Sequence, residues 1–295
     1  MNLRSFAIAL LISASTTHAA ESDWTTPQAP FRIHGNTYYV GTRGLSAILL
    51  TSDAGHVLID VPMAANVPAI EANVRALGFR IEDIKLILNS HAHFDHAGGI
   101  AALAADSGAV VQASAAGAKA LRVGGDDVDD PQHGLATPYA PVSEVTEFAD
   151  GETLHVGTLT LTAHITPGHT PGSTTWSWRS CVDADCLDLV YADSLTAMSN
   201  DAYRYSDPAH PKRVQDFRRG LATIAALPCD VLITPHPEAS GFSDRVKRRD
   251  AGDAQALIDR AACRVYADAA SARLDRRISD EHKAAHDDAA TELGH

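Results

Sequence analysis

The spacing of hydrophobic residues changes several times along the chain, and each change marks a new element. Three short runs between residues 37 and 61 are rich in β-branched and aromatic residues and predict strands, with "SDAG" as a turn between the last two. The next run, "PAIEANVRALG", predicts a helix, because Ile70, Val74 and Leu77 share one face. Gly78 ends this helix, so strands give way to a helix early in the chain.

Strands and helices continue to alternate until a long loop interrupts them. "IKLILNS" and "AVVQAS" predict strands, and "AGGIAALAADSG" and "AAGAKALRVGG" predict the helices that follow them. Residues 126–141 contain acids, prolines and few apolar side chains, so we expect a loop there. A loop of this length in a compact domain is often functional.

The second half of the chain begins with β-rich sequence and ends with helices. Leu159, Leu161 and Ala163 alternate with threonines, which predicts a half-buried strand. "STTWSWRS", "LDLVYADS" and "DVLITPH" predict further strands, and helical spacing covers about residues 212–227 and 253–278. Because no Pro/Ser-rich linker separates the halves, we expect a single domain over residues 21–280 and a polar C-terminal tail over residues 281–295.

The first twenty residues have the pattern of a secretory signal peptide. Arg4 precedes the short apolar run "FAIALLISA", and "THAA" ends in small residues. We expect residues 1–20 to be removed after about Ala19 or Ala20, which predicts export to the periplasm. No later stretch is long and apolar enough to predict a membrane span in the mature protein.

The composition of the chain indicates a folded protein that does not bind nucleic acid. The chain has 295 residues, of which 45% are hydrophobic, enough for a sizeable core. Its formal net charge is −13 and no basic patch occurs, so we expect no nucleic-acid partner.

Four cysteines remain in the predicted mature chain, and an even number in an exported protein favours disulfides. Four cysteines allow three pairings. Cys181 and Cys186 flank the acidic turn "VDAD", which suits a hairpin closure and leaves Cys229 with Cys263. Zinc ligation is the competing interpretation, but no CxxC spacing occurs.

The stretch "NSHAHFDHAGGI" places three histidines and an aspartate within six positions, between a predicted strand and a predicted helix. Protonated imidazoles repel one another, so this stretch is either a solvated loop or surrounds something positive. Neutral imidazole nitrogens and carboxylate oxygens are the ligands that zinc accepts, usually four to a site. His91, His93, Asp95 and His96 are therefore candidate ligands.

Two further histidines complete a ligand set. His169 in "TPGHTPGS" and His236 in "TPHPE" each follow a β-rich run, with proline or glycine beside them, as rigid loop ligands would. One short loop cannot surround two metal ions alone, so these histidines bring the set to six candidate ligands on strand-end loops. A surface histidine cluster without metal is the alternative.

These stretches resemble the metallo-β-lactamase superfamily, and within it the class B β-lactamases of the third subclass. The resemblance rests on "YYVGTRGLSAILLTSDAGHVLIDVP", "NSHAHFDHAGGIAAL", "TPGHTPGSTTWSW" and "YADSLTA", and it spans about residues 24–278. It implies an α/β fold of the αββα type, in which two mixed β-sheets pack face to face and helices cover the outer faces. It also implies two Zn²⁺ ions per chain.

The same resemblance distributes the ligands between the two ions. It implies that His91, His93 and His169 bind the first zinc, and that Asp95, His96 and His236 bind the second. The other two subclasses place a cysteine at the second zinc, whereas this chain has "DSL" there. Cys229 and Cys263 are therefore better explained as a disulfide, as the resemblance also implies.

Metal chemistry and the resemblance together predict a reaction. A water shared by two zinc ions loses a proton near neutral pH. The resulting metal-bound hydroxide would hydrolyse the amide bond of penicillins, cephalosporins and carbapenems, with Asp95 as the catalytic group that orients it. The expected partner is thus a small β-lactam, the expected result is antibiotic resistance, and we expect a monomer.

Other residues are expected to support the site. The resemblance implies that Ser194 and Thr196 donate hydrogen bonds to the substrate carboxylate, with strand-end capping as the alternative, and that Asp60 supports the ligand loop from behind. The walls of the cleft are expected to include Gln132, His133 and Tyr139 on one side and Trp24 and Phe31 on the other.

Two rival functions remain open at this point. A thioester or lactone hydrolase of the same superfamily would use an aspartate that bridges both metals, and Asp193 could fill that role. The export signal, the cysteine pairs and the extended "TPGHTPGSTTWSW" match argue against it. The second rival is a periplasmic zinc-storage protein without catalytic activity.

Overall fold

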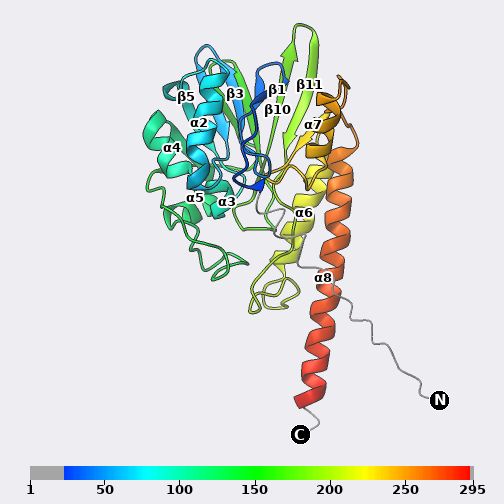
Figure 1. Ribbon diagram of the computed structural model, residues 1–295. Helices are drawn as coiled ribbons and strands as arrows, with labels where there is room; N and C mark the ends of the chain where they lie inside the picture. Colours follow the sequence, from blue (N-terminus) through cyan, green and yellow to red (C-terminus); the bar gives the residue numbers. More distant parts are fainter. Residues whose placement is uncertain (1–22, 293–295) are drawn as a thin grey trace, which may run out of the picture.

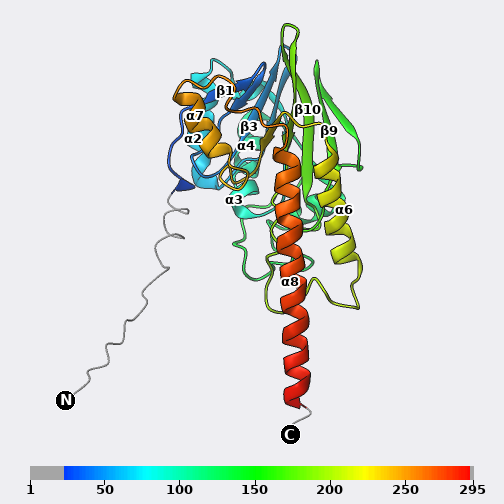
Figure 2. The same ribbon diagram turned by 90° about the vertical axis from the view of Figure 1, so that its right-hand side faces the viewer.

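The expected αββα sandwich is confirmed. A computed structural model describes residues 23–292, so the predicted signal peptide, residues 1–20, lies outside the described residues. Two sheets form the middle of the molecule, with α2, α3, α4 and α5 beside one sheet and α6 and α8 beside the other (Figure 1). Figure 2 shows the same layers from the side.

The first sheet has seven strands in sequence order, antiparallel from β1 to β4 and parallel from β4 to β7. Its strands are β1 (Phe31–His34), β2 (Thr37–Tyr39), β3 (Ile48–Ser52), β4 (Gly55–Ile59), β5 (Ile84–Leu88), β6 (Val110–Ser114) and β7 (Val145–Phe148). The nearby helices are α2 (Val67–Ala76), α3 (Phe94–Ala97), α4 (Ile100–Ser107) and α5 (Ala115–Arg122). Parallel pairing brings the carboxyl ends of β4 and β5 to one edge.

The second sheet has five strands in the order β12-β11-β10-β9-β8. These are β8 (Thr153–Val156), β9 (Leu159–Ile165), β10 (Thr174–Val182), β11 (Asp185–Tyr191) and β12 (Val231–Ile233). The helices α6 (Lys212–Ala226) and α8 (Ala262–Glu292) cover this sheet, and α7 (Phe242–Asp250) packs through Phe242 on Phe31 and Tyr39 of the first sheet. Leu159, Leu161 and Ala163 of β9 are buried, whereas Thr160 is exposed, so the predicted alternation is confirmed.

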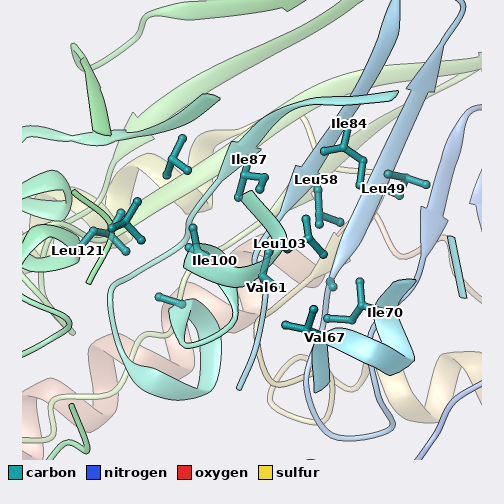
Figure 3. Close-up of a cluster of buried hydrophobic side chains, with 14 of the residues drawn as sticks. Leu49, Leu58, Val61, Val67, Ile70, Ile84, Ile87, Ile100, Leu103 and Leu121 are labelled. Carbon is teal, nitrogen blue, oxygen red and sulfur yellow. The ribbon is translucent and has the colours of Figure 1, made fainter. Parts of the chain in front are cut away.

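Apolar side chains fill three layers. The two sheets share a core that includes Leu50, Ile59 and Trp176. Beneath the helices of the first sheet lies a second cluster, shown in Figure 3, with Leu58 and Leu103 among its members. A third cluster lies between the second sheet and α6 and α8. The loops at one edge of the sandwich are therefore carried on strands that are packed into these clusters.

Several element boundaries differ from the sequence prediction. The pattern did not predict β1, β7 or α7. The last helix begins at Ala262 and continues to Glu292, whereas the pattern placed it at 253–278. Asp253 and Asp259 accept hydrogen bonds from the backbone N–H groups of residues 255 and 261, which favours turns over helix before Ala262.

Residues 281–292, which we expected in a polar tail, continue α8 instead. Glu281 is buried and accepts hydrogen bonds from the backbone N–H groups of Tyr205 and Ser206. These hydrogen bonds and the ion pair with Arg277, which outweigh the effect of burial, lower the pKa of Glu281. Although α8 is long, no helix within residues 23–292 is apolar enough over sufficient length to cross a membrane.

Both expected disulfides are present. Cys181 pairs with Cys186 across the β10–β11 hairpin, and Cys229 pairs with Cys263, which joins the segment before β12 to the start of α8. Within the described residues no cysteine is free, so none is left to ligate zinc.

Candidate metal centre

The six candidate ligands all lie shortly after the ends of strands, four of them on loops and two in a short helix. His91 and His93 follow β5, and Asp95 and His96 lie in the short helix α3 directly after them. His169 follows β9, and His236 follows β12. Because these strands belong to both sheets, the fold brings distant parts of the sequence to one edge of the sandwich.

His91, His93 and His169 form the first group. One nitrogen of each imidazole lies within 4.8 Å of the other two, and all three side chains are buried. Three converging imidazoles with little access to water match the ligand set of a zinc site that leaves a fourth position open.

In each imidazole of the first group, the nitrogen that points away from the other two rings has a hydrogen-bond partner. His91 Nδ1 donates to Asp193 Oδ1 at 2.7 Å, and His93 Nε2 donates to Asp130 Oδ2 at 2.9 Å. His169 Nδ1 lies 2.8 Å from Thr196 Oγ1 and 3.0 Å from the Thr196 carbonyl oxygen. Such contacts fix ring orientation and tautomer, which turns His91 Nε2, His93 Nδ1 and His169 Nε2 toward a metal.

Asp95, His96 and His236 form the second group. Asp95 Oδ2 lies 3.2 Å from Nε2 of each histidine, and the two Nε2 atoms are 3.1 Å apart. Ligand atoms of a tetrahedral zinc site with bonds of about 2.0–2.1 Å are about 3.3 Å apart, so this spacing fits one ion. Atoms of His91, Asp95 and His96 also approach within 4.8 Å, so the two groups adjoin.

The pKa shifts of His91, His169 and Asp95 suit metal binding, whereas burial is outweighed at His93, where the hydrogen bond and attraction to Asp130 raise the pKa. Burial, together with repulsion from neighbouring imidazoles, lowers the pKa of His169 to about 3 and holds the pKa of His91 well below its ordinary value. Burial alone would raise the pKa of Asp95, but His96 and His236 outweigh it and hold that pKa well below its usual range. Neutral imidazoles and an ionised carboxylate are the forms that bind zinc.

Asp60 contacts the segment just before His91 from the side of the core. Its Oδ1 accepts hydrogen bonds from Ser90 N and Asn89 Nδ2, and its Oδ2 accepts from the hydroxyls of Ser90 and Tyr191. The side chain is fully buried, and its backbone has a φ of 60°. Asp60 therefore fixes the residues just before His91 against both sheets.

Replacing Asp60 with alanine is expected to lower the free energy of unfolding by at least about 3 kcal/mol, because buried donors left without an acceptor cost about 1–3 kcal/mol each. Asparagine tolerates a positive φ and keeps one acceptor, so Asp60→Asn should lose less. Urea unfolding of the metal-free proteins measures both effects. Equal stability of Asp60→Ala and the unchanged protein would contradict this role.

The difference in stability between the unchanged protein and Asp60→Asn is expected to depend on pH. Burial raises the pKa of Asp60 to about 7, against which its hydrogen bonds act. The folded state therefore favours the protonated carboxyl more than the unfolded state does, so this contribution to stability is present at low pH and is lost as pH rises through about 7. The unchanged protein should lose stability relative to Asp60→Asn between about pH 4 and pH 7, with no further loss above that.

Of the residues expected to contact substrate or to line the cleft, some lie beside the candidate ligands and others do not. Ser194 is buried on the segment after β11, and Thr196 contacts His169, which the sequence did not predict. The Trp24 ring lies 5.4 Å from the His236 ring, beside the centre. Phe31 stacks on Tyr39 and packs, partly buried, against the core between the sheets.

The long loop reaches the site through a residue that the sequence analysis missed. Asp130, rather than Gln132 or His133, contacts a candidate ligand, and the Tyr139 hydroxyl donates to the backbone oxygen of Ala92 at 2.9 Å. Four of the five residues 126–130 are aspartates, so residue type alone could not single out one of them.

Comparison with known proteins agrees with this geometry. The family model of the metallo-β-lactamase superfamily matches residues 40–236, which is more than half of the chain. The chain belongs to the metallo-β-lactamase superfamily. The matched range includes all six candidate ligands.

The chain is also similar to solved metallo-β-lactamases, among them one of subclass B3. MEM-A1, a subclass B3 metallo-β-lactamase from a soil metagenome library, is 47% identical with a TM-score of 0.85, over 88% of this chain and 99% of that one. The Rm3 metallo-β-lactamase is 48% identical with a TM-score of 0.85, over 88% and 97%. MIM-1 from Novosphingobium pentaromativorans is 44% identical with a TM-score of 0.82, over 89% and 94%.

The chain also has a shorter match to a hydrolase of another name. A hydroxyacylglutathione hydrolase from Anaeromyxobacter dehalogenans (strain 2CP-C) is 37% identical over 93 residues, which are 32% of this chain. The chain matches only 28% of the length of that protein.

Proposed function

We propose that this protein is a dinuclear zinc hydrolase that opens the amide bond of β-lactams. The observation that carries the proposal is the pair of adjoining ligand groups, built from six residues on strand-end loops. Similarity to subclass B3 metallo-β-lactamases over nearly their whole length supports the choice of substrate class.

In this proposal His91, His93 and His169 hold the first zinc, and Asp95, His96 and His236 hold the second. When bound, the two ions would lower the pKa of a water so that it becomes a nucleophile near neutral pH, and would polarise the lactam carbonyl. Asp95 directs Oδ2 at the two histidines, which leaves Oδ1 to accept a hydrogen bond from the attacking water and orient it.

The substrate would lie between the long loop and the N-terminal segment. Thr196 is exposed beside His169, and Ser194 lies two residues before it, so their hydroxyls can donate to the carboxylate of a β-lactam. Trp24 would provide an apolar wall next to His236. We extend the proposal to penicillins, cephalosporins and carbapenems, and to a monomer in the periplasm after removal of residues 1–20.

Thioester hydrolysis is the second candidate, because the hydroxyacylglutathione hydrolase shares a segment with this chain. An aspartate that bridges both metals would be needed for it, and Asp193 is the candidate. However, Asp193 Oδ1 accepts the hydrogen bond from His91 Nδ1, on the side of the imidazole that faces away from the converging nitrogens. This contact favours the lactamase over the thioesterase.

One comparison of substrates distinguishes the two candidates. The purified zinc-loaded protein should hydrolyse a chromogenic cephalosporin and a carbapenem with kcat/KM at least about a hundredfold above that for an S-acylglutathione thioester. Preference for the thioester would overturn the proposed substrate, and Asp193→Ala would then be expected to lose metal.

A further inference from the structure

The loop over residues 126–141, which we name the cleft loop, holds the ligand segment at two points. Asp130 is only 5% exposed; its Oδ2 contacts His93 Nε2, and its Oδ1 accepts from the backbone N–H of Gln132 at 2.7 Å. Tyr139 donates its hydroxyl proton to the carbonyl oxygen of Ala92, which lies between His91 and His93. The cleft loop is thus attached both to a ligand ring and to the backbone beside it.

The opposite side of the site is attached to the same loop. Asn200 donates from its backbone N–H to the carbonyl oxygen of Pro131 at 2.7 Å, and from Nδ2 to that of His133 at 2.9 Å. Asn200 follows Thr196, which contacts the ring of His169. The cleft loop is therefore connected by hydrogen bonds to His93 on one side of the site and, through Asn200, to the segment that contacts His169 on the other.

We propose that Asp130 is a positioning residue through which metal binding at His91, His93 and His169 orders the cleft loop. The inference rests on the proposed metal centre and adds to it a coupling between the metal and the loop. A metal bound to Nδ1 fixes the rotation of the His93 ring, so Nε2 keeps pointing at Asp130. Without a metal the ring can turn away, and a buried carboxylate then loses its partner.

This coupling must act in both directions. If metal binding stabilises the ordered loop by a given factor, the ordered loop strengthens metal binding by the same factor. Removing Asp130 should therefore weaken zinc binding, and removing zinc should loosen the loop. Contacts of this kind to a ligand histidine change metal affinity by about 10–100-fold.

Two measurements on the full chain test the inference. Zinc affinity is measured by competition with a chromophoric chelator, and exchange of backbone amide hydrogens over residues 126–141 is measured with and without zinc. Asp130→Ala should bind zinc at the first site about 10–100-fold more weakly, and its loop should exchange at the same rate with and without zinc. Asp130→Asn, which keeps an acceptor for His93, should recover part of both effects.

Asp129→Ala is the matched control, because Asp129 is a neighbouring aspartate that is 69% exposed and pairs with Lys119 rather than with a ligand. It should match the unchanged protein in both measurements. The coupling would be overturned if Asp130→Ala bound zinc as tightly as the unchanged protein. It would also be overturned if hydrogen exchange of the cleft loop in the unchanged protein were the same with and without zinc. Neither result would contradict the metal centre. An unchanged protein that binds no zinc would overturn the proposed function itself. Unfolding of the metal-free variants shows whether each one folds.

Discussion

Replacing His169 with alanine is expected to lower kcat/KM for a chromogenic cephalosporin by at least about a thousandfold. His169 supplies one of the three converging nitrogens of the first group, and it is the member that comes from the second sheet. Two imidazoles from one loop would remain, which is too few to hold zinc in a site with one open position. Initial rates and zinc content per chain measure the effect together.

His164→Ala provides the control for this substitution. His164 lies on β9, five residues before His169, and its Nε2 contacts Ser177 Oγ at 2.8 Å rather than any candidate ligand. It should retain both zinc ions and most of the activity. If His169→Ala kept its zinc and lost less than about tenfold in kcat/KM, the first group would not be the metal site.

Replacing Asp95 with asparagine is expected to lower kcat by about 10²–10⁴-fold. The Asp95 carboxylate has two proposed roles, because Oδ2 completes the second ligand group and Oδ1 orients the attacking water. Asparagine has nearly the same shape but no charge, so it should weaken the second zinc site more than the first. Steady-state kinetics at saturating zinc, with zinc content measured in parallel, separates lost metal from lost orientation.

Asp106→Asn is a matched control for Asp95→Asn, because Asp106 is an exposed aspartate on α4, away from both ligand groups. Its kcat and zinc content should equal those of the unchanged protein. An Asp95→Asn variant with full activity and two zinc ions would show that neither task belongs to Asp95.

The sequence alone could single out the six candidate ligands that the fold brings together, because residues that suit zinc also follow predicted strands there. The histidines follow β-rich runs, and strand ends in a layered sandwich meet at its edge. For Asp60, the family resemblance supplied the supporting role, and the structure added the four donors that explain it.

Contacts made across the fold could not be predicted. Asp130 is one of several aspartates in a loop without periodicity, and only tertiary structure shows which of them meets His93. The end of α8 was missed for a similar reason. Its polar sequence suggests a tail, but Glu281 is buried there against the backbone of Tyr205 and Ser206.

The most direct test of the central claim is hydrolysis of a chromogenic cephalosporin by the purified protein, before and after treatment with a chelator. We predict rapid turnover that the chelator abolishes and that added Zn²⁺ restores, with full activity at two zinc ions per chain. A protein that binds two zinc ions and yet does not hydrolyse the cephalosporin, or one whose turnover survives removal of its metal, would contradict the account.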